Sequence, residues 1–269
     1  IGFSHIHSWT MGGLLTMPVT GPLKIKPGEE NEPDSGYRSR INHKNEKASL
    51  SYYSVLLDDY NIKAELTSTT RTGFQGYTFP KSDSSRILFD LENGSEYPYE
   101  VRWASISKVS DYEIEGFSTQ SSYDEPTNLL NDYTVYFVAR VDKPMKSFGT
   151  WVNGYVDTTS SICWGRHDIG AFMNFDTEEG EIIQLKTAIS YVSIEQARKN
   201  LEVESGGFGW NFDAVRKYAV NEWRKILSTI EIEGGTEEDK RKFYTNLYRS
   251  YCSRTIFSDV DGQYVDMYE

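Results

Sequence analysis

The chain has 269 residues, of which 40 are acidic and 28 are basic, so its formal net charge is −12. Nucleic acids and anionic membrane surfaces are bound by concentrated positive charge, which argues against both as partners. The aromatic content of 14%, with 19 tyrosines and 6 tryptophans, is instead common where sugars or extended ligands are held.

The length and the hydropathy pattern set further bounds. A chain of this size can bury a sizeable core and is expected to hold more than one structural unit. No apolar run approaches the roughly 20 residues that span a bilayer. Any signal peptide is expected to have been removed or to lie upstream of Ile1. Cys163 and Cys252 are too few for a disulfide framework, and the sequence leaves open whether they pair.

The N-terminal histidine segment, residues 2–9, places His5, His7 and Trp9 within five residues and beside glycines. Alternate residues of extended backbone point to the same side, so the three side chains can line one surface. An indole beside two imidazoles suits a sugar, which offers an apolar C–H face and hydroxyls. Ordinary packing of a glycine-rich strand is an equal alternative. A zinc site is disfavoured, because the two other histidines have no ligand-like spacing.

The next polar segment, Tyr37–Arg40, places two arginines beside a tyrosine. Guanidinium groups in this setting bind a carboxylate or sugar hydroxyls. A loop fixed by salt bridges is the more common outcome, and the sequence alone favours it.

From residue 50 to residue 192 the apolar pattern mostly has a period of two, and β-branched and aromatic residues dominate it, which predicts strands. Many short strands without intervening helical patterns favour a sandwich or barrel over βαβ units. The predicted strands are Tyr52–Leu57, Ile62–Leu66, Arg86–Leu91, Tyr112–Phe117, Tyr133–Val141, Ile169–Phe175 and Ile182–Val192.

After Val192 the period becomes helical. Ser193 and Gln196 resemble a capping box and predict a first helix, a second is predicted over Asn211–Thr229, and Thr236 is expected to cap a third. The third apolar stripe has few sequence-local partners, which indicates the beginning of a helical domain. The expected apolar faces are Ile194, Ala197 and Leu201; then Phe212, Val215, Ala219, Trp223 and Ile226; then Phe243, Leu247 and Tyr251.

Near the C-terminus, Asp259–Gly262 resembles the beginning of a calcium-binding loop. The EF-hand pattern needs glycine at position six and glutamate at position twelve, whereas Gly262 stands at position four and position twelve would be residue 270. The sequence therefore favours a simple turn here. The 40 acidic residues nominate no particular pair of catalytic carboxylates.

Segments spread over nearly the whole chain carry a family resemblance. They are Gly2-Phe3-Ser4-His5, Leu15-Thr16-Met17-Pro18, Tyr37-Arg38-Ser39-Arg40, Asn45-Glu46-Lys47-Ala48, Tyr52–Asp58, Ile62–Thr67, Arg71-Thr72-Gly73-Phe74, Ile189–Ser193, Ala197, Asn200-Leu201, Trp210, Trp223, Phe243-Tyr244 and Ser258–Gly262. In this order and spacing they resemble the N-terminal part of glycoside hydrolase family 92, the calcium-dependent exo-acting α-mannosidases. The run Ser160–His167 departs from that pattern.

The resemblance implies a mainly β fold with a C-terminal helical segment. An antiparallel β-sandwich is expected at residues 1–192, a helical linker at 193–235, and the first helix of a truncated (α/α)6 barrel at 236–269. Whether further strands precede Ile1 is left open. The catalytic glutamic acid, the aspartate base and most Ca²⁺ ligands are expected beyond Glu269, so no catalytic residue and no metal ligand is assigned within the chain.

The implied function is the N-terminal portion of an inverting α-mannosidase that releases mannose from N-glycans or yeast-type mannans. His5, His7 and Trp9 are the implied substrate-binding residues, with Trp9 packed against the sugar on the leaving-group side. Phe74 and Tyr37–Arg40 are weaker candidates. The implied partners are α-mannoside glycans and the (α/α)6 domain of the same polypeptide, and the implied cofactor is Ca²⁺.

The resemblance also implies a secreted, periplasmic or cell-surface location, and residues 1–269 alone are expected to be inactive. Two other interpretations stay open from the residues. An acidic, aromatic-rich sandwich is also the form of many non-catalytic carbohydrate-binding modules. A purely structural sandwich would bury His5, His7 and Trp9 at an interface.

Overall fold

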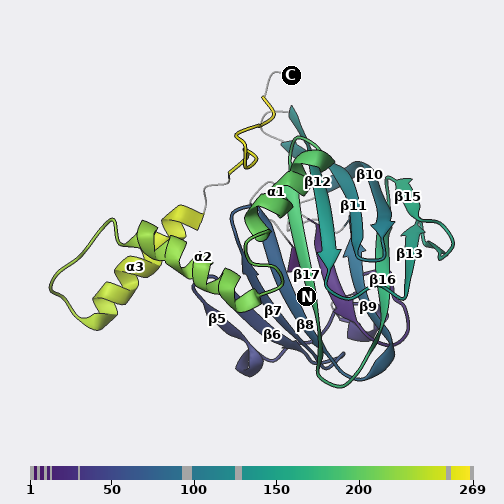
Figure 1. Cartoon of the computed structure of the whole chain (residues 1–269), viewed down its shortest axis with the longest axis horizontal. Helices are drawn as coiled ribbons and strands as arrows, with labels where there is room; N and C mark the ends of the chain where they lie inside the picture. The colour runs from purple at the N-terminus through teal and green to yellow at the C-terminus, as the bar shows by residue number, and fades with distance from the viewer. Residues whose placement is uncertain are drawn as a thin grey trace.

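The computed structural model describes residues 3–4, 7–8, 11–12, 14–29, 31–92, 99–124, 129–252 and 256–266. In this part of the chain two antiparallel sheets face each other, and three α-helices follow them in sequence (Figure 1). The predicted mainly β fold with a C-terminal helical segment is confirmed.

Across the described residues, the sheets contain the following strands in spatial order. The larger sheet runs β15 (Ile162–Gly165), β10 (Tyr99–Ser110), β11 (Glu113–Asp124), β12 (Leu129–Val141), β17 (Glu181–Ser190), β8 (Thr72–Phe79), β7 (Ile62–Ser68), β6 (Tyr52–Leu57) and β5 (Lys47–Ser49). The smaller runs β1 (Phe3–Ser4), β4 (Leu15–Val19), β9 (Ser82–Asp90), β16 (Ile169–Thr177), β13 (Ser147–Val152) and β14 (Tyr155–Asp157). A ribbon pairs β2 (His7–Ser8) with β3 (Met11–Gly12), and short 3₁₀ turns cover Pro33–Ser35 and His43–Asn45.

The core lies between the two sheets, where alternate side chains of each strand point inward. Ile87 and Phe89 enter it from the smaller sheet, and Val55, Ile106 and Phe137 enter it from the larger. All five are almost completely removed from water. Burying each such side chain contributes about 1.5–3 kcal/mol, so this layer is the main source of stability of the sandwich.

Helix α1 (Ile194–Ser205) lies on the outer face of the larger sheet, over β12 and β17 (Figure 1). Its N-terminus is capped by Ser193, whose Oγ accepts a hydrogen bond from the Gln196 N–H at 3.2 Å. The helix buries its predicted face, because Ala197 and Leu201 form a small apolar cluster with two residues of those strands. The first predicted helix is therefore confirmed together with its cap.

Helices α2 (Phe212–Leu227) and α3 (Glu237–Cys252) form a hairpin that projects from the side of the sandwich (Figure 1). Val215 and Ala219 of α2 are buried as expected. Ile226 is 39% exposed, so the expectation that it points inward is wrong. None of the residues of α3 is buried. In its apolar stripe Phe243 and Leu247 are half-buried and Tyr251 is exposed. Among the described helices, none is long and apolar enough to cross a membrane.

Candidate functional site

The N-terminal histidine segment is attached to the smaller sheet at its beginning. Phe3 on β1 pairs with Thr16 on β4, and its buried ring lies 6.1 Å from the Tyr77 ring. Further along, His7 pairs with Gly12 through the backbone. His5, Trp9 and the His7 side chain lie outside the described part of the structure, so their sugar-binding role stays a prediction.

A buried polar cluster fixes the beginning of this segment. Thr16 Oγ1 lies 3.2 Å from the Phe3 carbonyl oxygen, 2.9 Å from Gln75 Oε1 and 3.2 Å from the Tyr77 hydroxyl. The Tyr77 hydroxyl also donates to Gln75 Oε1. Burial raises the pKa of Tyr77, so the phenol stays a neutral donor. Thr16 belongs to the smaller sheet and Gln75 to the larger. The cluster therefore holds the beginning of the histidine segment in a fixed position relative to both sheets.

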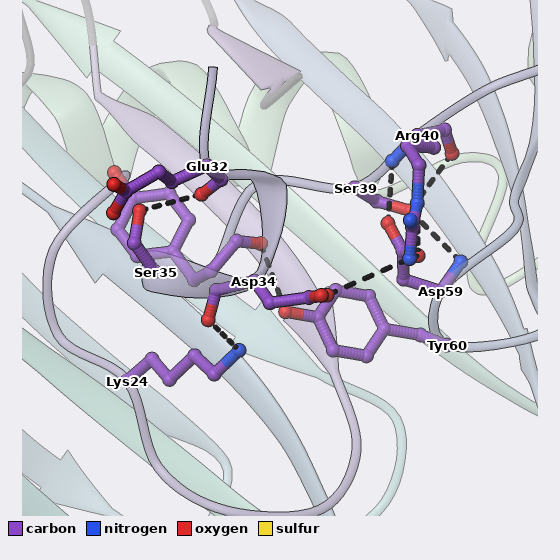
Figure 2. Close-up of polar contacts among 9 residues, drawn as sticks. Lys24, Glu32, Asp34, Ser35, Ser39, Arg40, Asp59 and Tyr60 are labelled. Atoms are coloured by element: carbon purple, nitrogen blue, oxygen red, sulfur yellow. Dashed lines mark hydrogen bonds and ion pairs between the residues drawn. The ribbon is translucent and has the colours of Figure 1, made fainter. Parts of the chain in front are cut away.

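The Tyr37–Arg40 segment lies at a hollow of about 250 Å³, and Figure 2 shows the polar contacts around it. The residues that line the hollow are Thr20, Pro22, Lys24, Asp34, Arg38, Arg40, Asp59 and Tyr60. Both cationic side chains and carboxylates therefore line its wall.

Arg40 is held by two carboxylates. Its Nε donates to Asp59 Oδ1 at 2.6 Å, its backbone N–H donates to Asp59 Oδ2 at 2.6 Å, and its guanidinium lies 3.5 Å from Asp34 (Figure 2). Burial disfavours the charged form of Asp59, but the hydrogen bonds from Arg40 outweigh it and hold the pKa of this carboxyl below its ordinary value. The Arg40 side chain is therefore committed to the loop and is not a free sugar ligand.

Tyr37 is also committed to structure. It is 1% exposed, and its hydroxyl donates to Asp90 Oδ2 at 2.6 Å. Its carbonyl accepts from the Tyr60 hydroxyl at 3.0 Å, and burial raises the pKa of Tyr60 to about 12. The expectation of a loop fixed by salt bridges is thus confirmed for Arg40, whereas Tyr37 is fixed by hydrogen bonds. In the described structure Arg38 lines the hollow and has no ion pair.

The loop that precedes this segment is compact because two glycines meet in it. A Cβ on Gly36 would lie 2.1 Å from the Gly28 nitrogen, so no other residue fits there. Ser35 Oγ accepts from the Glu29 N–H at 2.8 Å and donates to the Glu32 carbonyl at 2.6 Å. Lys24 Nζ donates to the Asp34 carbonyl at 2.7 Å (Figure 2). Backbone contacts, and not side-chain charges alone, shape this wall of the hollow.

Phe74, the other weaker candidate for sugar contact, lies under the helical linker. It is 2% exposed, and the ammonium of Lys186 lies 5.4 Å from its ring and 4.2 Å from the ring of Trp210. Burial lowers the pKa of Lys186, and the nearby charge of Arg140 adds to this effect. Phe74 therefore packs inside the structure and offers no face to a ligand.

The Asp259–Gly262 segment forms a turn, in which the Gly262 N–H donates to the Asp259 carbonyl at 2.9 Å. The carboxylate of Asp259 is buried and accepts from Ser190 Oγ at 2.8 Å and from Asn200 Nδ2 at 2.7 Å. The Val260 N–H donates to Asn200 Oδ1 at 2.9 Å. The turn is thus fastened to the end of β17 and to α1, which confirms the favoured interpretation of this motif.

The part of the chain that the structure describes does not fit a calcium site. Among them no group of three or more histidine, cysteine, aspartate or glutamate side chains is placed to hold a metal ion. In the Asp259 turn, Asp261 is engaged by Lys199 Nζ at 2.6 Å and by Gln196. The hydrogen bond from Lys199 is the main cause that lowers the pKa of Asp261 to about 2.

Sequence reasoning missed an interlocked set of charges around α1. Glu204 accepts from Arg71 Nη1 at 2.7 Å, from the Arg71 backbone N–H at 2.8 Å and from Thr69 Oγ1 at 2.5 Å. Arg71 Nε also donates to the Ser258 carbonyl at 2.7 Å. These residues are up to 187 positions apart, so no local pattern could have paired them. Glu204 did not stand out in the sequence, because α1 also carries Glu195 and Glu202.

Comparison with known proteins matches both parts of the chain to one family. The model of the glycosyl hydrolase family 92 N-terminal domain matches residues 1–190, and the model of the family 92 catalytic domain matches residues 196–269. The chain belongs to glycosyl hydrolase family 92. The resemblance found in the sequence is therefore confirmed.

Solved family 92 structures share the fold. A family 92 α-mannosidase from Bacteroides thetaiotaomicron, in complex with mannoimidazole, is 32% identical with a TM-score of 0.85, over 95% of this chain and 33% of that one. The family 92 glycosyl hydrolase ccman5 is 28% identical with a TM-score of 0.82, over 98% and 36%. A curated relative from Arthroderma benhamiae, an uncharacterized secreted glycosidase, is 23% identical over 94% of this chain and 35% of that protein. The chain spans about a third of each of these relatives.

Proposed function

We propose that this chain is the N-terminal portion of an exo-acting, calcium-dependent, inverting α-mannosidase that releases mannose from glycans such as N-glycans or yeast-type mannans. The observation that carries the proposal is the 32% identity to an α-mannosidase over 95% of the chain. The match of residues 196–269 to the catalytic-domain model favours an enzyme over a non-catalytic carbohydrate-binding module.

In this proposal the sandwich supplies sugar contacts and the rest of the polypeptide supplies the chemistry. His5, His7 and Trp9 contact mannose, and their segment is positioned by the buried cluster of Thr16 and Tyr77. The acid and base lie beyond Glu269, and inversion requires their carboxyl groups to be roughly 6.5–9.5 Å apart so that water fits between. Ca²⁺ is bound mainly outside the described residues. Residues 1–269 alone are inactive, and the whole protein is secreted, periplasmic or on the cell surface.

The test is mannose release from α-linked mannobioses by the full-length protein, with and without EDTA. We expect release that EDTA abolishes and added Ca²⁺ restores, with β-mannose as the first product seen by NMR. A first-formed α-mannose would contradict inversion, and release that survives EDTA would contradict calcium dependence. No release from any linkage by folded protein supplied with Ca²⁺ would favour the binding-module alternative.

A further inference from the structure

Trp103 on β10 and Trp164 on β15 form an exposed aromatic pair at one edge of the larger sheet. Their ring centroids are 5.4 Å apart and their planes are inclined by 31°. Trp103 is 39% exposed and Trp164 is 61% exposed. Two adjacent indoles left in water form an apolar surface of the kind that marks a binding site.

The strand register places both indoles on the outer face of the sheet. Trp164 lies opposite Ser105 on β10, and Trp103 lies two residues before Ser105. Between and behind them, Ala104 and Cys163 point inward and are buried. Because successive side chains alternate between faces, the two indoles and Ser105 share one surface, which the ladder between β10 and β15 holds in place.

The helices lie elsewhere on the same face. Helix α1 contacts β17, β12 and β8, with few contacts to β11, and α2 contacts β7 and β8. In Figure 1, β15 is at the edge of the sheet away from α2 and α3. Within the described residues, the indole pair is therefore left open to solvent.

Hydroxyl groups continue the surface beside the pair. Thr119 on β11 lies opposite Trp103, and its Oγ1 is 2.9 Å from Thr134 Oγ1 on β12. Ile162, which is 49% exposed, precedes Trp164 on the outer face of β15. Flat indole faces next to neutral hydroxyls match a sugar chain, whose C–H faces stack on the rings while its own hydroxyls bond to water and to threonine.

We propose that Trp103 and Trp164 form a surface that binds a neutral polysaccharide chain. A net charge of −12 disfavours an anionic polymer. The choice of a saccharide over another neutral polymer rests on the proposed function. The surface belongs to the larger sheet, whereas the N-terminal histidine segment begins on the smaller sheet, so the proposal adds a second place of sugar contact. The fixed ladder presents both rings ready for stacking, which limits the entropy lost on binding.

The experiment is affinity electrophoresis of the full-length protein in gels that contain yeast α-mannan, with starch and β-mannan gels as further neutral polymers. The double variant Trp103→Ala/Trp164→Ala is compared with wild type and with Tyr112→Ala. Tyr112 is a matched control because it is 48% exposed and lies just past the far end of β10. We expect at least one polymer to retard wild type and the control equally, and the apparent Kd to rise at least tenfold in the double variant.

Other outcomes would overturn the proposal. These are equal retardation of wild type and the double variant, or no retardation of wild type by any polymer. A third is full protection of both indoles from acrylamide quenching in the full-length protein, which would show that another part of the polypeptide covers them. If the double variant is unfolded by circular dichroism, Trp164→Ala alone replaces it and is expected to weaken retention at least threefold.

Mannobiose hydrolysis is measured on the same proteins to separate this proposal from the proposed function. We expect the rate of mannose release to be equal in wild type, control and double variant. Retardation without any mannose release would count against the α-mannosidase proposal and leave the indole surface supported. Mannose release without retardation would support the α-mannosidase proposal and contradict the proposed indole surface.

Discussion

Tyr60 is a residue whose ionisation links the candidate hollow to stability. Its hydroxyl donates to the Tyr37 carbonyl, and burial raises its pKa to about 12, whereas an unfolded tyrosine ionises near a pH of about 10. The folded state therefore holds this proton more tightly than the unfolded state does. The protonated Tyr60 hydroxyl contributes fully to stability below a pH of about 10, and this contribution is lost as the pH rises through about 12.

We expect the melting temperature of the protein to fall steeply over that alkaline window, and Tyr60→Phe to make the fall less steep. The measurement is the melting temperature at a series of alkaline pH values, with phenolate absorbance followed in parallel. Burial also raises the pKa of Tyr191, so the variant removes only part of the slope. An unchanged slope in Tyr60→Phe would contradict the assignment.

Asp259 is the residue that fastens the C-terminal turn. In Asp259→Ala, the buried donors Ser190 Oγ and Asn200 Nδ2 each lose the carboxylate oxygen that accepts their hydrogen bond. We expect a loss of about 1–3 kcal/mol of unfolding free energy, the usual cost of unsatisfied buried polar groups. The matched control is Asp261→Ala, because this neighbour makes its contacts at the surface. Urea denaturation of both variants is the measurement, and equal losses would argue against a special role for Asp259.

At the scale of elements, α1 is held to the sheet by a partly buried ion pair. The side chains of Arg71 and Glu204 are 18% and 10% exposed. Glu204→Ala leaves the guanidinium without its main partner on α1, which costs up to about 3–5 kcal/mol when a buried pair is broken. Glu202→Ala is the control, since this side chain on the same helix is 58% exposed. Similar midpoints of chemical denaturation for the two variants would refute the argument.

The elements also show what the sequence could and could not predict. Tyr52–Leu57 was predicted with its observed bounds, because its aromatic and aliphatic residues are bounded by Ser51 and Asp58. The strand β8 was missed, because nearly all of its residues are buried. Helix α1 covers part of its outer face, and a strand buried on both faces has no period-two pattern. Alternation is therefore informative only where one face meets water.

For the candidate site the limit is different. The motif Tyr37–Arg40 was found from residue types, but its partners Asp59 and Asp90 come from later segments. The pair of Trp103 and Trp164 depends on the register between β10 and β15, which no local signal predicts. Residue chemistry can be predicted from the sequence, whereas the partner of each residue requires the sheet order.

At the scale of the whole molecule, we expect the sandwich and α1 to unfold as one cooperative unit. Val138 and Ala188 on the outer face of the larger sheet are buried together with Ala197 and Leu201 of the helix. A chain of residues 1–192 would expose this cluster and leave Arg71 without Glu204. We expect residues 1–205 to melt at a higher temperature than residues 1–192, in a single transition. Equal melting temperatures by differential scanning calorimetry would show that α1 does not stabilise the sandwich and that residues 1–192 are stable without it.

The fastening of Asp259 to Ser190 and Asn200 also determines how mechanical load passes through the protein. The chain leaves the sandwich at the end of α1, makes the α2–α3 excursion, and returns to nearly the same point. We therefore expect tension applied beyond the turn to reach the end of β17 and helix α1 through Asp259 before it loads the α2–α3 hairpin. Because α2 is itself packed on β7 and β8, we expect the loop between α2 and α3 to be the part that can vary in length without moving Asp259.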